Sequence, residues 1–133
     1  MLIKKNKVEF INCNLAGFSH ADGHLVLNEM HPGDKLLMVR EEDNKPDHDA
    51  IALFYLPEGG FPQGAAMHNI EQYKDAVHVG YIPAAHNGEL AMFMDMGYTG
   101  IFECTIININ RDAHPEQKVR LRVSLLKRHH PHP

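Results

Sequence analysis

Six short runs of apolar and β-branched residues constrain the fold of this 133-residue chain more than any other feature. They cover residues 8–15, 35–40, 50–55, 77–82, 101–109 and 118–125, and segments rich in Gly, Pro, Asn and Asp separate them. Runs of this length and composition, bounded by turn residues, are typical of β-strands. We therefore expect a strand-dominated fold whose core is built from sheet residues.

The last run, KVRLRVSL at 118–125, has the clearest alternation. Its apolar set and its basic set are Val119, Leu121, Val123 and Leu125, and Lys118, Arg120 and Arg122. A period of two places the apolar set on one face of a sheet and the bases on the other. The basic stripe could follow a phosphate backbone. It could equally be a solvated face, or a charged edge that protects the strand from aggregation.

One segment has helical character. Leu90, Phe93, Met94 and Gly97 fall at helical spacing after Pro83, which suits a helix start because it lacks an N–H. Gly97 is expected to form the C-terminal cap. The sequence therefore predicts one helix between the fourth and fifth strands.

Residues 57–76 break the pattern, with two Pro, three Gly and no lasting periodicity. Because so long a loop is uncommon inside a compact domain, we interpret it as an insertion in a hairpin, with one helical turn near 69–75. A single domain then spans 1–128, and the His/Pro tail at 129–133 is expected to be disordered. The predicted fold is mostly β: a small barrel-like fold of about six strands with one or two helices, rather than a parallel α/β sheet.

Composition excludes several classes of protein. The formal net charge is −4, so nucleic-acid binding would have to come from a local patch or from shape. Cys13 and Cys104 lie far apart, which argues against a disulfide framework. The N-terminal stretch lacks the apolar run of a signal peptide, and no stretch approaches the ~20 apolar residues of a membrane span. We expect a cytoplasmic protein that does not enter a membrane.

The stretch REEDNKPDHD at 40–49 is the most unusual, because five carboxylates occupy residues 41–49, directly before an apolar run. As a calcium loop it fits poorly, since Lys45 occupies a ligand position and no Gly follows. A polar turn in which Asn44 and Asp47 bond the backbone around Pro46 explains the same residues. A shaped recognition loop is the third interpretation.

No constellation for catalysis is visible. The cysteines fall inside apolar runs, the serines lack an elbow motif, and GYIPAAHNG does not match a phosphate-binding loop. The eleven histidines offer no zinc-type spacing. We expect no enzymatic activity, no cofactor and no metal.

Four segments together resemble the HIRAN domain: residues 16–23, 31–53 and 79–97, and the two closing strands. The middle segment is the specific part, because it carries Arg40-Glu41, Asn44, Asp47 and Ala50-Ile51 at the family's spacing. The sequence VGYIP at 79–83 matches the next motif, and the resemblance covers about residues 8–126. It implies a mostly β fold, an OB-like or SH3-like small barrel of about six strands with one or two packed helices. In helicase-borne members such a domain grips the free 3′ end of single-stranded DNA.

The resemblance also implies roles for single residues. Asp47 matches the Asp that binds the 3′-hydroxyl, Asn44 matches the Asn before it, and Tyr81 matches a ring-bearing position. His20 and Ser19 stand where DNA-binding members carry an aromatic residue and an Arg, and Pro46 stands where many carry Tyr. With the basic residues added, the expected nucleic-acid-binding set is Asp47, Asn44, Tyr81, His20, Ser19, Arg40, Arg120 and Arg122.

Three functions remain open at this point. The first is a module that recognises free 3′ ends of single-stranded DNA in repair or replication-linked processes, as an accessory to a helicase or nuclease on another chain. The second is a protein-interaction or scaffold module of the same fold, which the acidic balance and the missing Arg and Tyr favour. The third is a component of a metal-dependent hydrolase, suggested only by scattered His and Asp residues.

Overall fold

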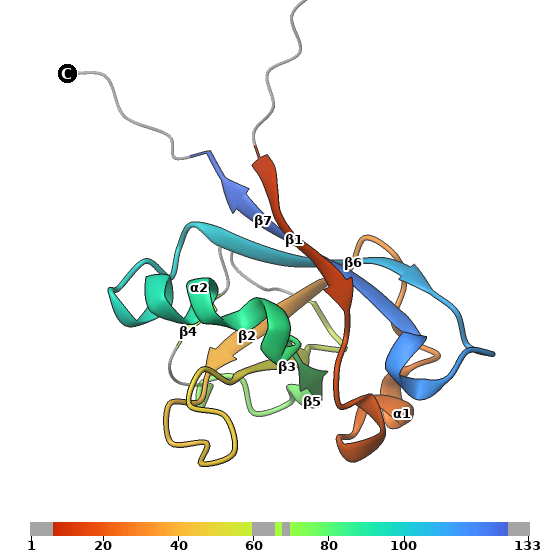
Figure 1. The fold of residues 1–133 in the computed structure, drawn as a ribbon. Helices are drawn as coiled ribbons and strands as arrows, with labels where there is room; N and C mark the ends of the chain where they lie inside the picture. The colour runs from red at the N-terminus through yellow and green to blue at the C-terminus, as the bar shows by residue number, and fades with distance from the viewer. Residues whose placement is uncertain (1–6, 60–65, 68–69, 128–133) are drawn as a thin grey trace, which may run out of the picture.

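The computed structural model describes residues 7–59, 66–67 and 70–127 (Figure 1). Within these residues strands dominate, and two α-helices and two short 3₁₀ helices (η) interrupt them. The elements follow in the order β1 (Lys7–Asn14), η1 (Phe18–His20), α1 (Gly23–Val26), β2 (Lys35–Arg40), β3 (Ile51–Tyr55), β4 (Ala66–Met67), β5 (Val77–Tyr81), α2 (Ala84–Asp95), β6 (Phe102–Ile109), η2 (Pro115–Gln117) and β7 (Val119–Leu126).

The strands form one curved sheet in the order β1-β7-β6-β2-β3-β5, and all neighbours on this path are antiparallel. Just after β1, Ala16 pairs with Tyr81 at the end of β5: each backbone N–H donates to the other's carbonyl, at 2.9 Å and 2.8 Å. This bridge brings the two ends of the sheet together at one point, without a continuous ladder. The prediction of a mostly β, OB-like small barrel with packed helices is confirmed.

The central strands β2 and β3 are buried on both faces. Leu36 and Met38 belong to the main core inside the curved sheet, which Leu90, Ala91 and Met94 of α2 also enter. On the outer face, Leu37, Val39 and Ala52 form a second cluster. Four partly buried side chains pack on this cluster: Phe54, Ile70, Tyr73 and Tyr81. Burial on both sides explains why the 35–40 and 50–55 runs are continuously apolar.

Helix α2 ends as the sequence predicts, because Gly97 adopts φ 95° directly after the last helical turn. The alternation in β7 holds only as far as Val123. Ser124 is 2% exposed, because it lies between Glu9 and Glu103 on the neighbouring strands. Leu125 is 36% exposed, because it lies opposite Val8, at the end of the sheet that extends past the core.

The insertion differs from the expectation. The helical turn expected near 69–75 is replaced over 70–76 by two consecutive turns, in which Tyr73 N–H donates to Ile70 and Ala76 N–H donates to Tyr73. The short strand β4, which runs parallel to β2, had no signal in the sequence. Between β1 and β2 the chain forms η1 and α1. Position 69 and the 129–133 tail lie outside the described residues.

Candidate nucleic-acid interface

The acidic loop, residues 41–50, joins β2 to β3 and is built from turns three residues apart. The N–H of Asn44 donates to Glu41 O at 3.1 Å, that of Asp47 to Asn44 O at 3.2 Å, and that of Ala50 to Asp47 O at 3.1 Å. The Glu41 N–H closes the base of the loop on Ala50 O at 2.9 Å. A hydrogen bond thus holds the backbone at every third residue of the loop. Asn44 and Asp47, which the sequence analysis singled out, are among these residues.

Side chains add to this framework. Asn44 Oδ1 accepts from the Asp47 N–H at 3.3 Å, and Asp47 Oδ1 accepts from the Asp49 N–H at 2.9 Å. Both side chains thus bond the backbone around Pro46, as expected, and the Asp47 bond, which spans two residues, is an Asx turn. The polar-turn interpretation is therefore correct for the loop's internal structure, and it leaves Asp47 partly exposed.

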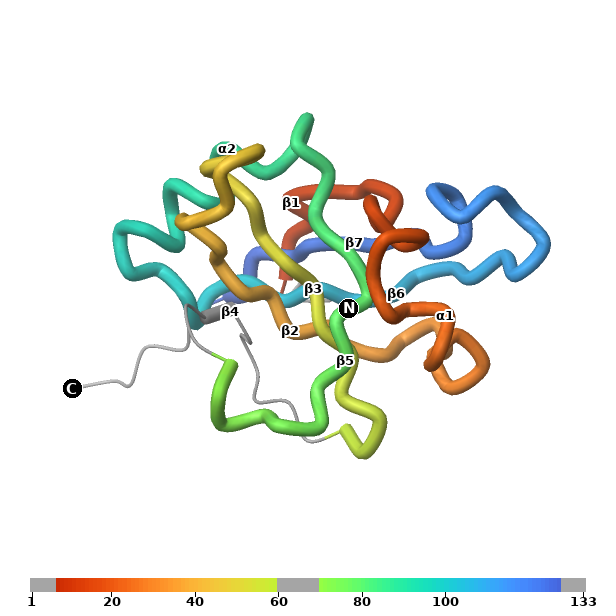
Figure 2. Tube along the Cα trace, turned by 90° about the horizontal axis from the view of Figure 1, so that it is seen from below, coloured from red at the N-terminus to blue at the C-terminus, as the bar shows by residue number. Residues whose placement is uncertain are grey.

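The acidic loop also contacts helix α2, which lies beside it (Figure 2). Asn87 Nδ2 donates to Asp47 Oδ2 at 2.8 Å, and Asn87 itself is 2% exposed. Nothing in the sequence pattern indicated Asn87 as a site residue.

Glu41 links two of the expected residues. Tyr81 Oη donates to Glu41 Oε1 at 2.9 Å, and Asn44 Nδ2 donates to the same oxygen at 3.2 Å. Burial, together with the Glu41 carboxylate, raises the pKa of Tyr81 to about 12, so the phenol keeps its proton at neutral pH. Asn44, Asp47 and Tyr81 thus form one hydrogen-bonded group, with Glu41 and Asn87 as members that the sequence did not reveal.

Aromatic rings extend from this group along the outer face of the sheet. The His78 ring lies 5.0 Å from the Tyr81 ring and 5.1 Å from the Phe54 ring, measured between centroids. All three side chains are partly exposed. They offer a row of π-surfaces that begins at the acidic loop.

Ser19 and His20 lie in η1 and are exposed. Figure 2 shows η1 on one side of β5 and the acidic loop on the other. The segment after η1 is held to β5 by the Asp22 N–H, which donates to His78 O at 2.8 Å. Among the described residues, no hydrogen bond joins the side chain of Ser19 or His20 to the acidic loop.

Arg40 lies beneath the loop rather than on the surface. Its side chain is 3% exposed, and its guanidinium donates to Asp95 Oδ1 and Oδ2 at 2.9 Å and 3.0 Å. A third bond, of 3.1 Å, reaches Ala50 O. In this conformation the guanidinium is not accessible to a phosphate.

Arg120 and Arg122 lie on the outer face of β7, beside β1. Arg122 Nε donates to Glu9 Oε1 at 3.0 Å, so a carboxylate neutralises its charge. Arg120 donates to the neutral Asn12 and Asn14 side chains, at 2.7 Å and 3.4 Å. Of the two, Arg120 has the charge more available for an anion.

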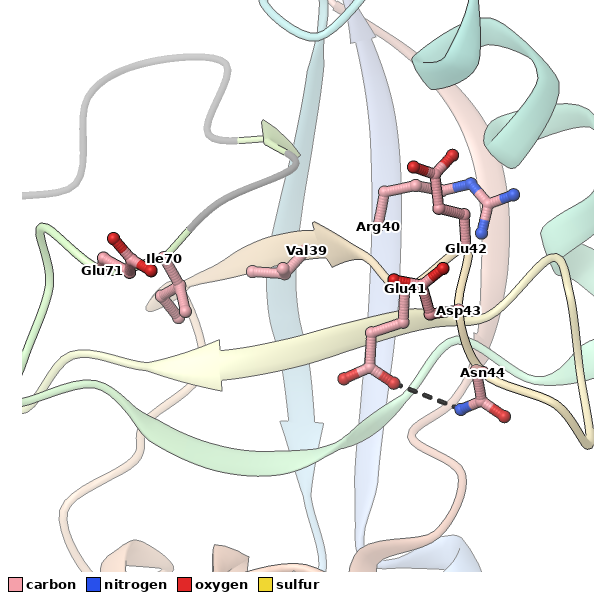
Figure 3. A pocket seen from close by; sticks show the side chains of 8 residues that line it. All are labelled: Val39, Arg40, Glu41, Glu42, Asp43, Asn44, Ile70 and Glu71. Atoms are coloured by element: carbon pink, nitrogen blue, oxygen red, sulfur yellow. Dashed lines mark hydrogen bonds between the residues drawn. The ribbon is translucent and has the colours of Figure 1, made fainter.

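A hollow of about 570 Å³ lies between the acidic loop and the 57–76 insertion (Figure 3). Glu41 and Asn44 line one end, and Ile70 and Glu71 of the insertion line the other.

Among the described residues, no three His, Cys, Asp or Glu side chains are grouped so that they could hold a metal ion. Within the same residues, no helix has the length and apolar character needed to cross a bilayer.

Comparison with known proteins identifies the fold and the family. The family model of the HIRAN domain matches residues 8–126. A crystal structure of a protein from Lactobacillus plantarum aligns with a TM-score of 0.66 at 20% identity, over 92% of this chain and 97% of that chain. The HIRAN domain of human HLTF aligns with a TM-score of 0.54 at 15% identity, over 90% and 78%. No curated protein matches the chain. The chain belongs to the HIRAN domain family, a family of nucleic-acid-binding modules.

Proposed function

We propose that this chain is a binding module for the free 3′ end of single-stranded DNA, and that the acidic loop receives the terminal nucleotide. The observation that carries the proposal is the Asp47 carboxylate, which is held in a fixed orientation, partly exposed and in the same hydrogen-bonded group as Tyr81. A fixed acceptor that shares a hydrogen-bonded group with an aromatic residue matches the two features of a strand end, a hydroxyl donor and a base.

The charge of the loop supports selection for a hydroxyl. An ionised carboxylate only accepts hydrogen bonds, so Asp47 can bind a 3′-hydroxyl but repels a 3′-phosphate. The exposed neighbours Glu42, Asp43 and Asp49 add to that repulsion. The excess of carboxylates in the loop thus favours a 3′ end that carries no phosphate.

The row of rings supports contact with the bases. Stacking of a base on an aromatic side chain contributes about 1–3 kcal/mol and tolerates any sequence. Tyr81 is nearest to the loop and would take the terminal base, and His78 continues the row. Such a site prefers single strands, because paired bases do not expose their faces.

Phosphate contacts would come from outside the acidic loop. Among the described residues, the hydrogen-bond partners of Arg120 are neutral, so its charge is available for a phosphate. Ser19 and His20 on η1 supply further donors. In this proposal Arg40 holds the loop from beneath, and the module works in DNA repair or replication beside a helicase or nuclease on another chain.

Asp47→Ala tests the proposal, with Asp43→Ala as the matched control. Both variants remove one loop carboxylate, so both reduce the general repulsion of DNA equally. We expect Asp47→Ala to weaken binding of a 5′-labelled oligothymidine with a free 3′-hydroxyl at least about tenfold, in fluorescence anisotropy at low salt. Asp43→Ala should bind as well as the unaltered protein, or more tightly. Equal affinities for the two variants would contradict the role of Asp47.

A scaffold module of the same fold is the second candidate. The net charge of −4 and Pro46, which stands where many DNA-binding members carry a ring, favour it. Under that function the folded protein would show no affinity for single strands even at low salt.

A further inference from the structure

Asn87 is a buried polar residue whose place in α2 needs an explanation. Its neighbours along the core-facing side of the helix, Leu90, Ala91 and Met94, are apolar and buried. An amide at such a position is costly unless it is hydrogen-bonded. Its Nδ2 donates to Asp47, 40 residues earlier in the chain. We infer that Asn87 is the positioning residue of the end-binding site, and that it sets the direction in which the Asp47 carboxylate points.

The geometry at Asp47 carries this inference, which rests on the proposed function. An ionised carboxylate has about four acceptor positions on its two oxygens. Oδ1 uses one for the Asp49 N–H at 2.9 Å, and Oδ2 uses one for Asn87 at 2.8 Å. With both oxygens tied, the carboxylate cannot rotate freely, and the remaining positions face a ligand in a fixed direction.

The two bonds come from different parts of the fold. The Asp49 N–H belongs to the loop itself. Asn87 belongs to a helix of 12 residues anchored in the core, whose last residue, Asp95, also binds Arg40 at the base of the loop. Asn87 is therefore the contact through which the core, rather than the loop, fixes Asp47.

A positioning role predicts a selective defect. Because Asn87 is buried, it would help only the contact that Asp47 makes with the 3′-hydroxyl, and stacking and phosphate contacts would be unchanged. The ratio of affinities for a 3′-hydroxyl strand and a 3′-deoxy strand isolates that contact. A purely structural role would weaken both strands equally and leave the ratio unchanged.

The test compares Asn87→Leu, which keeps the size but cannot donate, with His86→Ala, an exposed neighbour on the same turn. Anisotropy titrations use 5′-labelled oligothymidines that end in a 3′-hydroxyl or a 3′-deoxyribose. We expect Asn87→Leu to lower the hydroxyl-to-deoxy affinity ratio about three- to tenfold, the range for losing one pre-ordered side chain, and His86→Ala to leave it unchanged. In an Asp47→Ala background, Asn87→Leu should have no further effect on the ratio.

Asn87→Ala serves as a second variant if Asn87→Leu does not fold, as judged by circular dichroism. An unaltered ratio in the folded variants, or equal weakening of both strands, overturns the role of Asn87 and leaves the proposed function intact. A ratio of one in the unaltered protein overturns the proposed function, and the role of Asn87 with it.

Discussion

The Arg40 guanidinium donates two parallel hydrogen bonds to the Asp95 carboxylate, at 2.9 Å and 3.0 Å, and so joins the end of β2 to the end of α2. The two partners are not equally buried: the Arg40 side chain is 3% exposed and that of Asp95 is 41% exposed. Removing one partner therefore has a different consequence from removing the other.

Asp95→Ala should lower the free energy of unfolding by about 3 kcal/mol, because it strands a buried guanidinium whose other carboxylate, Asp49, is 3.9 Å away. Arg40→Met should lower it by only about 1–2 kcal/mol, since the Asp95 side chain is 41% exposed and its charge stays hydrated, and Ala50 O keeps its bond from the Glu41 N–H. Urea denaturation of the two variants gives both values. A larger loss for Arg40→Met would contradict this account of the pair.

Gly80→Ala should disrupt the closure of the sheet. Gly80 has φ 156°, and a Cβ there would lie 2.4 Å from Ala16 O and 2.8 Å from Leu15 Cδ1. The bridge between Ala16 and Tyr81 would have to open, at a cost of about 2 kcal/mol or more. Thermal unfolding followed by circular dichroism measures the loss. Gly100→Ala is the control, because a Cβ at Gly100 meets nothing within 4 Å.

Glu103 should make stability depend on acidity. Its burial acts to raise its pKa, but hydrogen bonds from Lys35 at 2.8 Å and Lys7 at 3.0 Å outweigh burial, and the pKa lies below the ordinary 4.5. A carboxyl with a lowered pKa in the folded state adds stability above pH 4.5, which is lost as the pH falls through the folded value.

Glu103→Gln removes this contribution, so its free energy of unfolding should fall less than that of the unaltered protein between neutral pH and about pH 3.5. Urea titrations at several pH values provide the comparison. Parallel pH profiles for the two proteins would show that Glu103 gives no such dependence.

The two thiols should be inert in the folded protein. Cys13 and Cys104 are both buried and unbonded to each other. Burial raises the pKa of Cys13 to about 11, and it raises the pKa of Cys104 as well. At about pH 8 roughly one Cys13 in a thousand would be a thiolate. A chromogenic disulfide reagent should therefore react with both cysteines only after denaturation. Fast reaction of either cysteine in the native protein would contradict the prediction that the thiols are inert.

Most of the fold could be predicted from local pattern. The runs at 35–40 and 50–55 are apolar throughout because both faces of β2 and β3 are covered, and strand composition alone identifies them. The parallel strand β4 could not be predicted, because two residues carry no period and their pairing depends on β2, far away in sequence. The burial of Ser124 could not be predicted, because it comes from neighbours on two other strands.

Only part of the candidate site could be predicted from the sequence. Asn44, Asp47 and Tyr81 stand in motifs that resemble a known family, and the structure brings these three together. Glu41 and Asn87 could not be predicted as site residues, because each acts through a partner 40 residues away in the sequence: Tyr81 for Glu41, and Asp47 for Asn87. Arg40 was expected at the interface as a basic residue, but it is buried against Asp95, a partner 55 residues further along the chain that the local pattern does not indicate.

Fluorescence anisotropy with two 5′-labelled oligothymidines, one ending in a 3′-hydroxyl and the other in a 3′-phosphate, tests the central claim most directly. At low salt we expect the protein to bind the hydroxyl end at least about tenfold more tightly, because the Asp47 carboxylate accepts a hydrogen bond from the hydroxyl and repels the phosphate. Equal affinity for the two ends, or no binding of either, would contradict recognition of the 3′ end by the acidic loop.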